Sequence, residues 1–313
     1  MTCPIGVVET GRSIWDTTNY PSPQLNPRPV IGVLTQDCVS SSGRIFTADC
    51  TEDVGFVSAA YVKWLEASGA LVHIVPLLTP HDEMTKLLQN ELSGLLIPGS
   101  GSWKPYYQKL ARHIVEEAKN GNIDVPVFGT CMGIEIMAKV LTNDDNVLIT
   151  TEGTNNHALP MNVLERKSSK MWSGLTDDLL EKFENQNITM NAHKYGFRPD
   201  QCTSDMIVTG TSVDSEGLVF VAAMEHKNLP IYGVQWHPEK ANFEFPRNNP
   251  QKYDDTGIHQ SRSALEASQF IGNFFVDQAR KHRNRYSLTD KYLSYSMNAR
   301  RVTSSYHIQN YYL

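Results

Sequence analysis

The sequence predicts an α/β fold in three layers, with a mostly parallel sheet covered by helices on both faces. Short, continuous apolar runs alternate along the chain with segments whose apolar residues recur at helical spacing. The apolar runs do not alternate with polar residues, as they would in a sheet with one face in water. This pattern is typical of parallel strands buried on both faces.

The first strand–helix unit begins at residue 30. Residues 30–34 (VIGVL) form an apolar run of strand length. Val57, Ala60, Tyr61 and Trp64 then follow the i, i+3, i+4, i+7 spacing of one helical face, which ends near Gly69. We expect Tyr61 to pack in the core.

The same alternation continues to about residue 150. It predicts strands and helices in turn over residues 70–75, 80–91, 94–97, 107–118, 125–129 and 134–141. Beyond residue 150 the strand candidates, which look more antiparallel, are residues 158–164, 205–211, 217–224 and 230–236. A last amphipathic helix is expected over residues 261–283.

These elements divide the chain into three parts. Residues 1–29 are rich in proline and predict an irregular arm. Residues 30–283 hold the predicted α/β domain. Residues 284–313 are rich in tyrosine and show neither helical nor strand periodicity, so we expect a loosely held tail.

Composition narrows the class of ligand. The 313 residues include 28 Lys and Arg against 34 Asp and Glu, a net charge of −6. That balance, without basic blocks or an apolar run near the roughly 20 residues of a membrane span, argues against nucleic acid and membrane as partners. Five scattered cysteines do not suggest a disulfide scaffold, and the N-terminus shows no signal peptide. A small molecule or peptide is the expected ligand.

Residues 129–133 (GTCMG) follow a predicted buried strand and open a helix. This is the context of a nucleophile elbow, here with Cys131 as the nucleophile. The glycines fit because a sharp turn leaves no room for Cβ atoms beside the nucleophile. At a helix N-terminus we expect the thiol pKa to be lowered. The alternative is a small structural cysteine packed under the turn.

A second motif supplies the base that a cysteine nucleophile needs. Residues 232–240 (YGVQWHPEK) end a predicted strand. His237 is placed to take the thiol proton and return it to a leaving amine, and Glu239 to orient the imidazole. A surface turn is the alternative for the tripeptide taken alone.

Both motifs, with Glu135 shortly after the first, resemble those of the class I glutamine amidotransferase-like hydrolases. Further likeness to the γ-glutamyl (folylpolyglutamate) hydrolases lies in residues 59–66, 69–70, 158–162 and 190–194. The resemblance runs from about residue 28 to 283. It implies a flavodoxin-like, class I glutamine amidotransferase-like fold.

The resemblance also implies roles for individual residues. The catalytic group would be Cys131, His237, Glu239 and a second histidine, His193. The oxyanion hole would use the backbone of Met132, Gly99 and Ser100. Ser100 departs from the family, which usually has glycine there, and would be strained if that position requires a positive φ.

The implied activity is that of a cysteine-type omega peptidase. It would hydrolyse γ-glutamyl bonds of folylpoly-γ-glutamates through a thioester, with no cofactor or metal. Lys104, Lys194 and Lys240 would meet substrate carboxylates, unless they are solvated surface lysines. The family also implies a possible homodimer and a lysosomal, vacuolar or extracellular location. The alternatives are a glutaminase domain that supplies ammonia to a partner synthase, and a non-catalytic binding protein on the same fold.

Overall fold

The computed structural model describes residues 25–38, 55–101, 105–244, 257–283, 286–287, 292–301 and 309–313. Its main sheet has eight strands. Their order is β4 (Leu71–Val75), β1 (Val30–Leu34), β5 (Gly94–Ile97), β6 (Val127–Thr130), β14 (Ile231–Val234), β13 (Val219–His226), β12 (Met206–Val213) and β9 (Asn162–Val163). The first five strands are mutually parallel, and the last three join them in antiparallel pairs.

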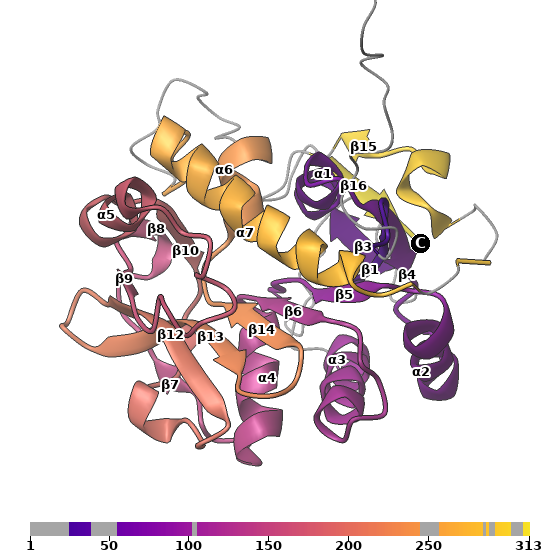
Figure 1. The fold of residues 1–313 in the computed structure, drawn as a ribbon, viewed down its shortest axis with the longest axis horizontal. Coiled ribbons are helices and arrows are strands. Elements are labelled where there is room, and N and C mark those ends of the chain that lie inside the picture. Colours follow the sequence, from indigo (N-terminus) through magenta and orange to yellow (C-terminus); the bar gives the residue numbers. More distant parts are fainter. Residues whose placement is uncertain are drawn as a thin grey trace, which may run out of the picture.

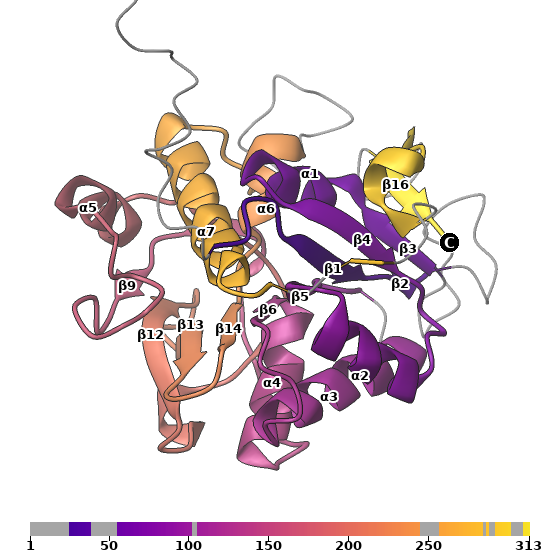
Figure 2. The same cartoon turned by 45° about the vertical axis from the view of Figure 1, so that its right-hand side comes forward.

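Helices cover both faces of this sheet (Figures 1 and 2). One face carries α1 (Ala59–Ala67), α5 (Asp177–Asn185), α6 (Pro238–Phe243) and α7 (Arg262–Arg280). The other carries α2 (His81–Asn90), α3 (Pro105–Lys119) and α4 (Met132–Thr142). Each face has its own cluster of buried apolar side chains. The predicted three-layer α/β fold is therefore confirmed.

The structure differs from the prediction mainly in short elements. Val57 lies in strand β3 (Gly55–Ser58), and α1 begins only after the Ser58 side chain caps it. Residues 158–164 are not one strand, because β8 (Asn155–Leu159) ends before Pro160 and β9 follows. β8 pairs with β10 (Thr189–Ala192), and β7 (Ile149–Thr150) pairs with β11 (Tyr195–Gly196). β14 is parallel to β6 rather than part of a purely antiparallel set.

The described part of the C-terminal segment is paired with the domain. β16 (Gln309–Tyr312) lies antiparallel to β3, in a small sheet with β15 (Arg300–Arg301) and β2 (Gln36–Asp37). Tyr311 is buried in the core, and Leu293 forms a bridge to His73 on the edge strand β4. The absence of strand periodicity here was therefore misleading, because a four-residue strand shows too little pattern to detect.

Two sequence expectations, the irregular N-terminal arm and the absence of a membrane span, can be compared only with the described residues. Residues 1–24 of the predicted N-terminal arm lie outside the described residues. None of the helices in the described ranges is both long enough and apolar enough to cross a membrane.

Candidate active site

The predicted site residues follow three adjacent strands. Gly99 follows β5, Cys131 follows β6 and His237 follows β14, and these strands are neighbours and parallel. The carboxyl ends of parallel strands meet at one edge, where α/β proteins place their sites. The fold therefore brings together three segments that are far apart in the sequence.

Cys131 has the backbone geometry of a nucleophile elbow. Its φ of 51° and ψ of −112° lie in a region that a non-glycine residue rarely adopts. Its amide donates to Val234 O, and α4 begins at the next residue. A Cβ on Gly129 would lie 2.7 Å from the backbone of Gly133. The prediction of a strand–turn–helix without room beside the nucleophile is confirmed.

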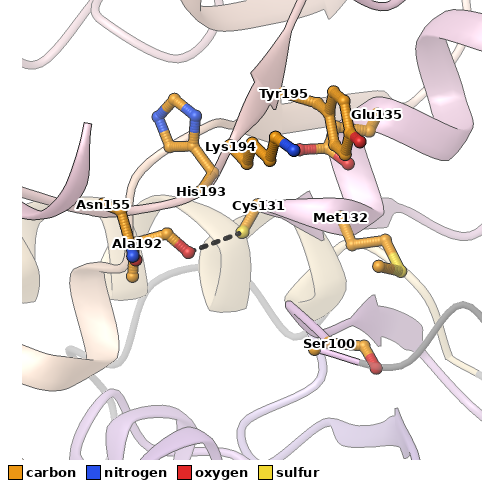
Figure 3. Close-up of a pocket in the computed structure, with 10 residues that line it drawn as sticks. Ser100, Cys131, Met132, Glu135, Asn155, Ala192, His193, Lys194 and Tyr195 are labelled. Carbon is orange, nitrogen blue, oxygen red and sulfur yellow. Dashed lines mark hydrogen bonds between the residues drawn. The ribbon is translucent and has the colours of Figure 1, made fainter. Parts of the chain in front are cut away.

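The thiol pKa does not follow the sequence expectation. Burial raises the pKa of Cys131 well above its ordinary value, and the nearby Glu135 carboxyl raises it further. The Met132 N–H, which faces the sulfur, lowers it only in part. The resting group is a neutral thiol, and its Sγ lies 3.9 Å from Ala192 O (Figure 3). The pKa-lowering effect of the helix N-terminus is smaller than the pKa-raising effect of burial, because the Cys131 side chain is only 6% exposed.

His237 and Glu239 form the predicted pair. Nδ1 of His237 lies 2.8 Å from Glu239 Oε1, and both side chains are buried. Burial raises the pKa of Glu239, but the charge of His237, its hydrogen bond and Lys240 outweigh this and hold it below its ordinary value. The carboxylate is therefore ionised. When the ring is neutral, its proton is on Nδ1, which donates to this carboxylate, and Nε2 is free to accept another proton.

The loop after β5 packs against the side chains of Cys131 and His237. A Cβ on Gly99 would lie 2.7 Å from His237 Cε1 and 2.9 Å from Cys131 Cβ, so only glycine fits. The Gly99 N–H donates to Tyr61 and Thr130 at 2.9 and 3.1 Å. That N–H is therefore bonded in the interior, whereas the predicted oxyanion role needs it to face the cavity.

Ser100 is not strained in the way its substitution for glycine suggested. Within the described residues, four non-glycine residues have a positive φ, and Ser100 is not one of them. Ser100 lines the cavity beside Cys131. The loop therefore accommodates serine without a conformational penalty.

A cavity of about 260 Å³ opens beside Cys131. The described residues that line it include Cys131, Met132, Glu135, Lys194 and Tyr195. Figure 3 shows the side chains of Glu135, Lys194 and Tyr195 gathered on one side of it. The Lys194 Nζ lies 5.5 Å from the centre of the Tyr195 ring. The cavity is thus lined by both a thiol and a lysine side chain.

The other two predicted lysines differ from Lys194. Lys240 lies on α6, is 6% exposed, and has its charge near Cys131 and Glu239. Lys104 lies outside the described residues.

His193 lines the same cavity as Cys131, but its ring nitrogens contact other residues. Nε2 lies 3.0 Å from Asn191 Oδ1, and Nδ1 lies 3.4 Å from Thr151 Oγ1. Figure 3 shows the ring turned away from the Cys131 sulfur. Burial, with a smaller effect from the charge of His237, lowers the pKa of His193 to about 3. The ring is neutral at physiological pH and holds the 190–194 segment against the cavity.

Two site residues had no assigned role in the sequence analysis. Burial raises the pKa of Glu135 to about 7, although a hydrogen bond from Gln235 and the charge of Lys139 oppose the shift. Its position one helical turn after Cys131 was the available signal. Tyr61 is buried as expected, yet its hydroxyl lies 3.2 Å from His237 Nδ1. A buried tyrosine hydroxyl usually has a polar partner, which was the signal there.

No group of three or more His, Cys, Asp or Glu side chains in the described ranges is arranged to hold a metal ion.

Comparisons with known proteins agree on one family. The family model of class I glutamine amidotransferases matches residues 52–249. The γ-glutamyl hydrolase of Rattus norvegicus is 30% identical over 268 residues, which cover 82% of this chain and 78% of the rat protein. That of Mus musculus is 30% identical over 275 residues, covering 83% and 80%. γ-Glutamyl hydrolase B of Dictyostelium discoideum is 28% identical over 306 residues, covering 92% and 84%.

A solved structure from Thermoplasma acidophilum, described as a GMP synthase subunit, matches over 80% of this chain and 95% of its own length. Its TM-score is 0.49 at 14% identity, too remote to bear on the site. The amidotransferase match spans more than half of the chain, and the rodent relatives align over most of their length. The chain therefore belongs to the γ-glutamyl hydrolases of the class I glutamine amidotransferase family and is a hydrolase of that type.

Proposed function

We propose that this protein hydrolyses γ-glutamyl amide bonds through a thioester on Cys131. The supporting observation is that Cys131 stands on a strained elbow beside the buried His237–Glu239 pair, at the floor of a cavity. Because the thiol is neutral at rest, His237 Nε2 must take its proton as Sγ attacks the γ-carbonyl carbon.

The tetrahedral intermediate places a negative charge on the former carbonyl oxygen. The backbone N–H of Met132, which already faces the sulfur, would stabilise it together with the backbone of Ser100. The intermediate collapses as the C–N bond breaks and His237 protonates the leaving amine. Water, deprotonated by His237, then hydrolyses the thioester and releases the acid and the free thiol.

The cavity chemistry supports folylpoly-γ-glutamates as substrates. Each γ-linked glutamate carries an α-carboxylate, and Lys194 is the cation among the described residues that line the cavity. Glu135, with a pKa of about 7, is protonated under mildly acidic conditions and then does not repel that carboxylate. Lys194 therefore serves as the binding partner of the carboxylate next to the scissile bond.

Two features, a disulfide at Cys38 and the raised pKa of Glu135, support a location in a lysosome, a vacuole or the cell exterior. Cys38 is disulfide-bonded, and disulfides persist mainly in oxidising compartments. Neutral Glu135 favours activity below neutral pH. A homodimer stays a prediction, which light scattering on the purified protein would test.

The decisive experiment is mass spectrometry of a penta-γ-glutamyl folate incubated with the wild type, Cys131→Ala and Cys202→Ala between pH 4.5 and 7.5. Cys202 is the matched control, because it is the other free cysteine of the described chain. Shortened tails with the wild type and Cys202→Ala, but not with Cys131→Ala, are expected. Ammonia release from free glutamine without tail cleavage would instead favour a glutaminase, and no reaction with either substrate a binding protein.

A second comparison tests the role of Lys194. Lys194→Ala is expected to raise KM about tenfold with little change in kcat, because it removes binding shared by substrate and transition state. Lys167→Ala makes the same charge change at an exposed position away from the cavity. An equal effect of both variants would contradict the assignment.

A further inference from the structure

The Tyr61 hydroxyl is a buried junction that the mechanism above does not use. The side chain is 1% exposed and does not line the cavity. Its oxygen accepts the Gly99 N–H at 2.9 Å, and it lies 3.3 Å from the Thr130 hydroxyl and 3.2 Å from His237 Nδ1. One hydroxyl on α1 therefore connects the ends of β5, β6 and β14.

The proton on His237 Nδ1 has two acceptors. Because Glu239 is ionised, Nδ1 carries the proton and donates it mainly to Oε1 at 2.8 Å. The Tyr61 oxygen, at 3.2 Å, is the second acceptor. Burial and the charge of Glu239 raise the pKa of Tyr61 well above its ordinary value, so the phenol stays neutral. A ring held from two directions has less freedom to rotate than one held by a single carboxylate oxygen.

The same hydroxyl fixes the loop that carries Ser100. The Gly99 N–H is bonded inward, and the next two residues, Ser100 and Gly101, line the cavity. The Gly99 Cα also lies against His237 Cε1, since a Cβ there would be 2.7 Å away. Tyr61 therefore fixes the orientation of the loop and of the ring through one atom.

We propose that Tyr61 is a positioning residue that holds the His237 ring and the Gly99 loop in register during catalysis. The proposal rests on the proposed function, because it assigns His237 as the base. Tyr61 acts on the ring and not on the substrate, so its removal affects kcat and leaves KM nearly unchanged.

Tyr107 provides a matched control. It is also a fully buried tyrosine under this loop, and its hydroxyl donates to Pro98 O. Tyr107→Phe removes a hydroxyl of the same kind from the same loop, and no hydrogen bond joins Tyr107 to His237. We expect Tyr61→Phe to lower kcat on penta-γ-glutamyl folate about tenfold, with KM within about twofold of the wild type, and Tyr107→Phe to lower kcat much less. Equal losses of kcat would show a role in packing alone and overturn the proposal.

A spectroscopic readout separates this proposal from the activity itself. In protein labelled with ¹⁵N-histidine, the Nδ1 proton of His237 is identified by its loss in His237→Gln. Its resonance is expected to move in Tyr61→Phe and not in Tyr107→Phe, with melting temperatures checking that both variants fold. A failure of the wild type to cleave γ-glutamyl bonds would refute the proposed function and leave this test intact.

One measurement needs no variant. In the wild type, a nuclear Overhauser effect is expected between the His237 Nδ1 proton and the ring protons beside the Tyr61 hydroxyl. Its absence, or an unchanged Nδ1 resonance in a folded Tyr61→Phe variant, would show that the hydroxyl does not hold the ring.

Discussion

Glu239 places one carboxylate oxygen 2.8 Å from Nδ1 of His237, and its other oxygen is buried without a hydrogen-bond partner among the described residues. The carboxylate is thus committed to a single imidazole. Glu239→Gln removes the charge and can present an N–H to Nδ1, which favours the wrong tautomer of the ring. We expect kcat to fall at least about tenfold.

Single-turnover kinetics would measure that loss. Glu225→Gln is a suitable comparison, because Glu225 is equally buried but accepts hydrogen bonds from residues 169–171. It should destabilise the protein without changing kcat per folded molecule. Unchanged kcat in Glu239→Gln would show that the carboxylate does not orient the base.

Gly99→Ala should inactivate the protein while leaving the fold intact. The new methyl group would lie 2.7 Å from His237 Cε1 and must displace the ring or the loop. Displacements near 1 Å in a catalytic group can cost about 100-fold in rate. Gly174→Ala is the control, since its Cβ would meet only Phe270 at 4.0 Å. Activity within a few-fold of wild type in Gly99→Ala would contradict the geometry of the loop.

Glu135 should make the folded state less stable as pH rises. Its folded pKa of about 7 lies above the unfolded value near 4.3, so the folded state favours the protonated form. This contribution is fully present below about pH 4.3 and is lost as pH rises through about 7, a change on the order of 3 kcal/mol.

The measurement is the free energy of unfolding from urea titrations at pH 5 and pH 8. Glu135→Gln keeps an acceptor for Gln235 and removes the titration. The variant should therefore lose less stability than the wild type between the two pH values. Equal losses of stability in the wild type and Glu135→Gln would mean that the Glu135 carboxyl is not protonated in the folded state.

The contribution of His193 to kcat/KM should not depend on pH in the range where the enzyme works. Its pKa of about 3 keeps the ring neutral above pH 4.5, so it adds no limb to the pH–rate profile. His193→Asn removes both ring contacts and should lower kcat/KM by a constant factor between pH 4.5 and 8. A factor that varies with pH would show that His193 exchanges protons during turnover.

The sequence predicted those strands whose residues are apolar throughout. The apolar runs at residues 30–34 and 94–97 predict β1 and β5 with their bounds, because strands buried on both faces must be apolar throughout. β3 and β16 were missed. Each has four residues, and their pairing joins positions such as Val57 and Tyr311, which no local pattern connects.

In the site, the motifs predicted which side chains lie together but not the direction in which a backbone N–H points. Cys131, His237 and Glu239 lie together as their motifs indicate. The same motifs do not show that the Gly99 N–H faces inward, because this depends on Tyr61, which α1 brings from elsewhere in the chain. The thiol pKa was likewise mispredicted, since helix position can be inferred from sequence but burial by Ala192 and its neighbours cannot.

The hydroxyl of Tyr61 and the ring of His237 meet although they are 176 positions apart in the chain. Such a contact carries a large loop-closure cost and belongs to the slow, non-local part of folding. A polypeptide that has formed only its first strands and helices would carry Cys131 without His237, its proposed base. Activity therefore requires that the sheet has formed as far as β14. A nascent or partly unfolded chain would have the Cys131 thiol but no histidine beside it to remove its proton.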